Sequence, residues 1–346
     1  MGLHKGAKTF ARYKVGRQEK SLPGLADEDA RRIAHGAFAG FTENDERGVV
    51  MGWIPFADPD HPEQAGADYG YDGFVFLGVR EDKRSVPPAL LKRRCAERME
   101  EFLVKSGREY LSRAEKEELL SLTRKELIQQ ALPSTTTYDL FWDVDREELL
   151  IFGGSTTAID ACAGLFQRTF QRKLVRFCPG SYFPGEAPVS GRDNWGARFL
   201  AWLWVQAHEG EHGVGIGDTV KLKTDWSSVT VTGEDLRENS LVRAAMHDGS
   251  IVAALRLFPT EGNDGSLSFT LTEGLVYKGL KTGLVAEPEA EGDLAEELIV
   301  HYAAIRPALE AVDQWWLMFA GAAFTGADLD AVEKWVHPQA EKVAAE

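Results

Sequence analysis

The spacing of apolar residues near the start of the chain predicts both strands and helices. Apolar and polar residues alternate as in strands at 10–15 and 48–53, and an apolar run at 74–79 predicts a further strand. Residues 27–38 have the spacing of a short helix. We therefore expect residues 1–79 to form an N-terminal α+β part.

The next block, residues 80–137, is predicted to be a helical arm. A Pro-Pro pair at 87–88 marks the start of a helix predicted over 90–104, and leucine and isoleucine recur at roughly helical spacing in a second helix over 112–132. The second helix opens with the form of a capping box, Ser112 with a glutamate three residues later. Two such helices predict an antiparallel helical hairpin.

Beyond the arm the pattern returns to short strands and helices. The predicted strands are 140–142, 149–152, 220–222, 229–231, 251–257 and 267–271, and the predicted helices are 156–170, 195–205, 236–246, 294–305 and 307–319. The chain is thus expected to be α+β, with mixed or antiparallel sheets. Its predicted parts after the arm are 138–285, which is α+β, and 286–346, which carries two helices and an acidic tail.

Length and composition fit a soluble globular protein. The chain has 346 residues, of which 44% are hydrophobic, enough for real cores. No apolar run reaches about 18 residues and the first residues lack the apolar stretch of a signal peptide, so we expect a cytoplasmic protein without a membrane partner. Cys95, Cys162 and Cys178 lack paired spacing and are expected to be buried thiols.

Charge is distributed unevenly along the chain. The formal net charge is −15, yet residues 79–133 carry 13 basic and 10 acidic residues, a net of 13 − 10 = +3. After Lys281 there are 3 basic and 13 acidic residues, a net of −10. Locally concentrated lysine and arginine bind phosphate whatever the total charge, so the arm is a candidate DNA surface. The alternative is a solvated helical arm of mixed charge.

A second basic run lies between Gln167 and Arg176, where no carboxylate interrupts the cations. With the arm, it completes the set of predicted DNA contacts, which are Lys83, Arg84, Lys92, Arg93, Arg94, Arg168, Arg172, Lys173 and Arg176. The alternative for the second run is that its cations complement the dipole at a helix C-terminus.

One motif suggests an enzyme. His208 and His212 belong to a literal H-E-x-x-H, the spacing that places two imidazoles on one zinc ion, and Glu234 is a possible third ligand. Gly210 inside the motif and the glycines after it predict that the helix ends there. We therefore expect no metal and no cofactor, and a zinc hydrolase is the third-ranked function.

Two other patterns are weaker. The glycine-rich stretch 213–218 precedes a predicted strand rather than a helix, so we expect a turn and not a phosphate-binding loop. Asp143, Asp145 and Glu147 could hold Mg²⁺ in a nuclease, but acids are common in a hairpin turn such as the one predicted there.

Seven short segments occur in an order that is informative as a set. They are Met51-Gly52-Trp53-Ile54-Pro55, Val79-Arg80-Glu81-Asp82-Lys83 with Pro87, the helical hairpin ending Ala131-Leu132-Pro133, Phe141-Trp142-Asp143, the helix from Thr156, Arg198-Phe199-Leu200-Ala201-Trp202-Leu203-Trp204, and Ser268-Phe269-Thr270-Leu271 before Gly279-Leu280-Lys281. Over residues 10–320 this series resembles the bacterial recombination-associated protein RdgC family.

The resemblance implies a fold and a function. It implies an elongated protomer whose helical hairpin forms a projecting tip, with tips and bases joining two copies into a ring-shaped homodimer. Duplex DNA would pass through a positively lined hole without sequence preference, and the protein would restrain strand exchange by a RecA-type recombinase and be nucleoid-associated. The tip contact would fall at Leu132, Pro133, Ser134 and Thr135.

The resemblance also leaves an alternative. Basic residues that line the hole in such a family would fall near Gly233, Glu234 and Ser250, none of which is basic. The second-ranked function is therefore a protein-interaction subunit that keeps this fold but binds DNA weakly.

Overall fold

The computed structural model describes residues 6–16, 27–42, 45, 47–56, 58–66, 70–177, 194–236, 238–261, 265–283 and 294–337. The predicted Pro/Gly-rich loop 178–191, Cys178 and the last part of the acidic tail lie outside the described residues. The chain divides into two compact units. Unit 1 comprises Met1–Pro23, Tyr71–Phe74 and Leu140–Glu346, and unit 2 comprises Gly24–Gly70 and Val75–Asp139.

Unit 2 combines a small antiparallel sheet with helices. Its elements are α1 (Asp27–His35), β2 (Val49–Ile54), a 3₁₀ turn (Pro62–Gln64), most of β4 (Phe74–Lys83), α2 (Pro88–Ser106), α3 (Arg113–Gln130) and the first part of β5 (Ser134–Asp143), with β3 (Gly70–Tyr71) beside β4. Trp53 of β2 is fully buried. Gly52 is required beside it, because a Cβ atom there would lie 2.5 Å from the Cα of Phe38.

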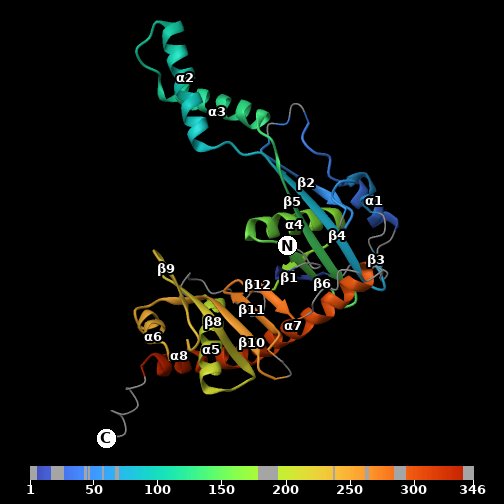
Figure 1. The fold of residues 1–346 in the computed structure, drawn as a ribbon, viewed down its shortest axis with the longest axis vertical. Coiled ribbons are helices and arrows are strands. Elements are labelled where there is room, and N and C mark those ends of the chain that lie inside the picture. The colour runs from blue at the N-terminus through green and yellow to red at the C-terminus, as the bar shows by residue number, and fades with distance from the viewer. Residues whose placement is uncertain are drawn as a thin grey trace. The chain divides into compact units, whose positions relative to one another are not determined.

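α2 and α3, both labelled in Figure 1, each have a defined cap, and that of α3 is the predicted capping box. α2 ends at Gly107, whose φ of 62° is the left-handed conformation that glycine adopts without strain. At the start of α3, the Ser112 Oγ accepts from the Glu115 backbone N–H at 3.2 Å and the Glu115 carboxylate accepts from the Ser112 N–H at 2.8 Å. The capping box is therefore confirmed. Buried Cys95 and Thr123 lie on α2 and α3, which pack on each other.

Unit 1 contains an antiparallel sheet, as predicted. Its remaining elements are β1 (Lys8–Val15), β6 (Glu148–Phe152), α4 (Thr156–Phe170), β7 (Leu174–Arg176), α5 (Trp195–Glu209), β8 (Val214–Lys223), β9 (Ser228–Thr232), α6 (Ser240–His247), β10 (Ile251–Pro259), β11 (Leu267–Thr272), β12 (Tyr277–Thr282), α7 (Leu294–Thr325) and α8 (Ala327–Val336). The strand order is β6-β1-β12-β11-β10-β8-β9, with residues 140–143 of β5 beside β6 and β7 beside β1. The α+β class is confirmed.

Helices α5 and α7 pack against β10 and β11, and α8 packs against both helices (Figure 1). Aromatic rings fill this layer: Phe199 of α5 lies 4.8 Å from Trp316 and 5.3 Å from Phe319, ring centre to ring centre. α4 packs on β6, and its Phe166 meets Trp142 of the neighbouring strand β5 edge-on at 5.4 Å. These rings form much of the core of unit 1. Each buried aromatic pair contributes about 0.5–1.5 kcal/mol of stability beyond the contribution from burying its apolar surface.

The prediction of two helices split before Pro307 is wrong. α7 is one helix of 32 residues with Pro307 inside it. Proline removes one hydrogen bond and usually breaks a helix, but Tyr302, Ile305 and Leu309 on either side of it are buried. Packing of this apolar face outweighs the local preference.

The predicted turn over 213–218 is also wrong beyond Gly213, because β8 begins at Val214. Gly215 and Gly217 serve close packing between strands: a Cβ at Gly215 would lie 2.2 Å from the Phe258 ring, and one at Gly217 would lie 2.8 Å from the Cγ of Arg256. The glycines therefore indicate crowding in a strand and not a loop.

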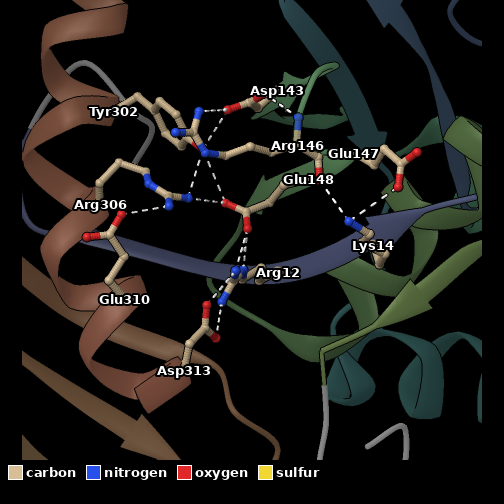
Figure 2. A network of polar contacts seen from close by, with 10 residues as sticks. All are labelled: Arg12, Lys14, Asp143, Arg146, Glu147, Glu148, Tyr302, Arg306, Glu310 and Asp313. Carbon is tan, nitrogen blue, oxygen red and sulfur yellow. Dashed lines mark hydrogen bonds and ion pairs between the residues drawn. The ribbon is translucent and has the colours of Figure 1, made fainter. Parts of the chain in front are cut away.

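A buried polar network fastens α7 to the sheet of unit 1 (Figure 2). Arg12 of β1 donates from Nε to Glu148 at 2.6 Å and from Nη1 to Asp313 of α7 at 2.6 Å. The Tyr302 hydroxyl lies 3.0 Å from an Asp143 oxygen and 3.2 Å from Glu148. Burial, with the nearby carboxylates, raises the pKa of Tyr302, so its hydroxyl keeps its proton and remains a donor.

Candidate nucleic-acid interface

One face of the sheet β12-β11-β10-β8-β9 carries polar and basic side chains. Along β8 the apolar residues Val220 and Leu222 are buried, while Lys221 between them is exposed. β11 shows the same alternation, with buried Leu271 and a half-buried Thr270. Because successive side chains point to opposite faces of a strand, the apolar set meets the helices and the polar set forms the other face.

The pairing register places this polar set in cross-strand rows. Thr272 pairs with Ala254, Ala254 with Lys221, and Lys221 with Thr230. A neighbouring row begins with Lys278 opposite Thr270. We call this surface the open sheet face. It is hollowed into a groove of about 980 Å³ whose lining includes Arg176, Thr219, Lys221, Lys223, Trp226, Thr230, Thr270, Thr272, Glu273 and Lys278.

The open sheet face is basic. The lining of its groove contains four cations, Arg176, Lys221, Lys223 and Lys278, and one carboxylate, Glu273, a formal sum of 4 − 1 = +3. Arg256, Lys281 and the carboxylate Asp218 lie on the same strands. Both carboxylates are engaged by basic or amide groups. Glu273 pairs with Lys223 and accepts from the Asn194 amide at 2.6 Å, and Asp218 lies 3.7 Å from Arg256.

The remaining lysines of the open sheet face are available to an anion. Within the part of the chain that the structure describes, Lys221, Lys278 and Lys281 form no ion pair, and all three are exposed. Threonine hydroxyls of the same rows lie between them and can donate to phosphate oxygens. The arrangement can therefore hold a phosphate backbone.

The predicted DNA contacts at the end of α4 and just after it fall into two groups, one that lines the groove and one that does not. Arg176 of β7 lines the groove, where it also lies 3.5 Å from Asp160. Arg168 lies in the last turn of α4, and the Arg172 guanidinium lies 5.0 Å from the centre of the Trp142 ring. Lys173 is exposed next to it. Of this run, the structure brings only Arg176 together with the lysines of the open sheet face.

The predicted contacts of the arm lie in unit 2. Lys83 ends β4 and is exposed, and the Arg84 guanidinium stacks 4.1 Å from the centre of the Phe41 ring. On α2, Lys92 is exposed, while Arg93 and Arg94 both face Glu97, at 3.8 and 3.0 Å. Further pairs between arginine and glutamate follow along α2 and α3, at Arg98–Glu126, Arg108–Glu115 and Arg113–Glu117.

The residues predicted for the tip contact follow the C-terminal end of α3, opposite the turn that joins α2 to α3. Leu132 is 91% exposed, and Pro133 precedes β5. Ser134 and Thr135 are the first residues of β5, where Ser134 donates to the Lys83 carbonyl at 3.1 Å and Thr135 donates to Asp82 at 2.8 Å. They are thus strand residues beside β4, and a role in a dimer contact stays a prediction.

Asp82 shows how this strand end is held. Burial favours the neutral acid, but hydrogen bonds from Arg80 and Thr135 outweigh burial and hold the pKa of Asp82 below its ordinary value. Arg80 also lies 4.5 Å from the centre of the Phe38 ring.

The zinc motif lacks the geometry that it needs. α5 ends at Glu209, Gly210 has a left-handed φ of 76°, and His212 lies in the following turn with φ of 57°. His208 faces Glu238 at 3.8 Å, whereas His212 stacks on Trp202. Exposed Glu234 follows β9. The two imidazoles are therefore not one helical turn apart, and the described residues contain no group of three or more His, Cys, Asp or Glu side chains fit for a metal ion.

The carboxylates considered for a nuclease site have other partners. Asp143 accepts from Tyr302 and lies 3.2 Å from Arg146, and Glu147 pairs with Lys14 at 3.3 Å (Figure 2). Asp145 is exposed in the turn between β5 and β6. Asp143 and Glu147 are therefore engaged in the network that holds unit 1 together.

Sequence reasoning missed the lysines of the open sheet face. A signal was present, because Lys221 alternates with the apolar residues of a predicted strand. Lys278 could not be found in this way, since β12 was not predicted, and neither were β7 and α8. Glycine and two lysines interrupt the alternation of β12, and irregular pairing with β11 shifts its register.

Comparison with known proteins gives a family and no closer relative. None of the described helices is long and apolar enough to cross a bilayer. No curated protein matches the sequence. The family model described as "Putative exonuclease, RdgC" matches residues 26–300, which is well over half of the chain. The order of segments from β2 to β12 is thus the order of a known family, and this chain belongs to the RdgC family.

Proposed function

We propose that this protein binds double-stranded DNA without sequence preference through the open sheet face, acts as a homodimeric clamp, and modulates homologous recombination by a RecA-type recombinase. Membership of the RdgC family supports a recombination-associated, nucleoid protein in general. The observation that carries DNA binding is that Lys221, Lys278 and Lys281 of the open sheet face form no ion pair with the residues that the structure describes.

The dimensions of this face suit a duplex. Neighbouring strands lie about 4.8 Å apart, so the five strands from β12 to β9 span roughly 19 Å. Lys278 and Lys221 are three strand spacings apart, about 14 Å across the sheet. The major groove of B-DNA is about 12 Å wide. The two lysines can therefore reach phosphates on both sides of one groove, and threonines between them can position the backbone without reading bases.

Self-association is proposed to use the end of the helical arm at the turn between α2 and α3, in place of the contact predicted at residues 132–135, which lie at the other end of α3. Val104 near the end of α2 is 77% exposed, and Tyr110 in the turn before α3 is 79% exposed. Large exposed aromatic and apolar residues are typical of interface anchors. A contact at this end would leave the charged flanks of α2 and α3 in solvent.

The test compares two charge-matched variants. Lys221→Gln/Lys278→Gln removes two cations from the open sheet face, and Lys92→Gln/Arg93→Gln removes two from the arm. Duplex binding is measured by fluorescence anisotropy with a blunt duplex from 50 to 200 mM salt. For two lost phosphate contacts, the slope of log K against log salt should fall in magnitude by about 1.8 in the sheet variant.

The arm variant is expected to keep most of the slope, because the proposed duplex site is the open sheet face and Arg93 already faces Glu97. Lys14→Gln, which changes a half-exposed lysine paired with Glu147, is the control and should bind as the wild type. A larger loss in the arm variant, or wild-type binding that does not respond to salt, contradicts the proposal.

A further inference from the structure

The turn between β8 and β9 carries a tryptophan, Trp226, that is not part of the hydrophobic core. Trp226 is 95% exposed, whereas the other eight tryptophans of the chain are buried or half-buried. An indole ring left in water forfeits a large apolar contact area. A residue of this kind at a defined position indicates a surface that meets a ligand.

The turn is fixed by its own hydrogen bonds. The Thr224 N–H donates to the Ser227 carbonyl at 2.8 Å, and the Thr224 hydroxyl oxygen accepts from the backbone N–H groups of Trp226 at 3.3 Å and Ser227 at 3.1 Å. The hydroxyls of Thr224 and Ser227 lie 2.9 Å apart. The indole is therefore held on a braced turn, which lowers the entropy lost when a ligand stacks on it.

The surroundings of Trp226 are those of an anion site. The indole belongs to the lining of the same groove as Lys221, Lys223 and Lys278 (Figure 1 shows β8 and β9). One carboxylate, exposed Asp225, precedes it in the turn, and the groove carboxylate Glu273 is paired with Lys223. An aromatic face beside cations is the combination that binds a single nucleic-acid strand, with bases on the ring and phosphates on the lysines.

Bases inside a duplex cannot offer a face to an exposed ring unless the stack opens, whereas an unpaired base can. We propose that Trp226 stacks on an unpaired base that adjoins the duplex, so that the groove recognises junctions between double-stranded and single-stranded DNA. This inference rests on the proposed function, because the duplex portion would occupy the lysines of the open sheet face. The substrate class becomes DNA with a single-stranded overhang or gap.

The test uses two probes and one substitution. One probe is a blunt duplex, and the other is the same duplex with a short single-stranded overhang that carries 2-aminopurine next to the junction. Wild-type protein is expected to bind the overhang probe more tightly and to quench its 2-aminopurine fluorescence by stacking. Trp226→Ala should lose the quenching and about fivefold or more of the overhang affinity, and keep blunt-duplex affinity within about twofold.

Leu241→Ala is the control, because Leu241 is 68% exposed on α6 and does not line the groove. Equal losses of Trp226→Ala on both probes, or unchanged quenching, overturn the inference while leaving duplex binding intact. Absence of wild-type binding to the blunt duplex counts against the proposed function instead. If Trp226→Ala dissociates the homodimer and leaves both probes bound, the indole is a protein contact and the inference fails.

Discussion

Arg12 joins β1 to the long helix α7, and its removal tests what holds this helix on the sheet. Only about 8% of its side chain and 7% of that of Glu148 are exposed. Arg12→Met leaves the Glu148 carboxylate buried with the Tyr302 hydroxyl and with Arg306 at 3.4 Å, while Asp313, one-third exposed, returns to water. Breaking a buried pair from one side costs about 3–5 kcal/mol, so the free energy of unfolding should fall by that amount.

The double substitution Arg12→Met/Glu148→Met should recover a large part of this loss. An apolar replacement of both partners removes the stranded charge, and such replacements are often neutral. Urea unfolding followed by tryptophan fluorescence is the assay, since eight of the nine tryptophans lie in unit 1. Lys14→Met, whose side chain is half exposed, is the control and should cost at most about 1 kcal/mol. A loss below about 1 kcal/mol for Arg12→Met, or no recovery in the double variant, refutes this reasoning.

Three further predictions concern local structure. Gly196→Ala in α5 should destabilise unit 1 by about 3 kcal/mol or more in the same assay, because its Cβ would lie 1.7 Å from the Glu273 carbonyl oxygen. Gly164→Ala in α4, which meets only the Arg168 guanidinium at 3.3 Å, should instead be neutral or add up to about 1 kcal/mol, and the opposite order would contradict the packing. Ser112→Ala should cost α3 about 1 kcal/mol in thermal unfolding followed by circular dichroism. Hydrogen bonds from Arg108 and Ser112 lower the pKa of Glu115 to about 2. The ionised Glu115 side chain therefore stabilises the folded state above its ordinary pKa, and this stabilisation is lost as the pH falls toward 2. The difference in unfolding free energy between the wild type and Glu115→Gln should shrink over the same pH range, and a constant difference contradicts this prediction.

Local signals predicted the elements that local interactions determine. The helix 156–170 coincides with α4, and the capping box of Ser112 marks the start of α3, because each depends on side chains a few residues apart. Where packing overrode local preference, the sequence misled: Pro307 sits inside α7, and glycines lie within β8.

The candidate site was predicted only in part, for a reason of topology. Arg176, Lys221 and Lys278 are far apart in the chain and meet on one surface because β7 joins β1 while β12 and β11 lie between β1 and β10. Periodicity can place Lys221 opposite the buried face of its strand. Periodicity cannot show that β12 belongs to the same sheet, so the position of Lys278 on this surface could not be predicted from the sequence.

The net charge of a sequence segment is a poor guide to where phosphate binds. Of the 13 cations in residues 79–133, six arginines face a carboxylate within 4 Å: Arg80, Arg93, Arg94, Arg98, Arg108 and Arg113. The counterions released on binding are those condensed on the DNA, and a protein cation releases them only by neutralising a phosphate. An arginine that is already paired with a carboxylate must give up or share that pair to do so. Lys221 and Lys278 have no such partner among the described residues. The arm is therefore expected to contribute less salt-dependent affinity than its 13 cations suggest. On the open sheet face, where Arg176, Lys223 and Arg256 also face carboxylates, Lys221, Lys278 and Lys281 are expected to carry most of that affinity.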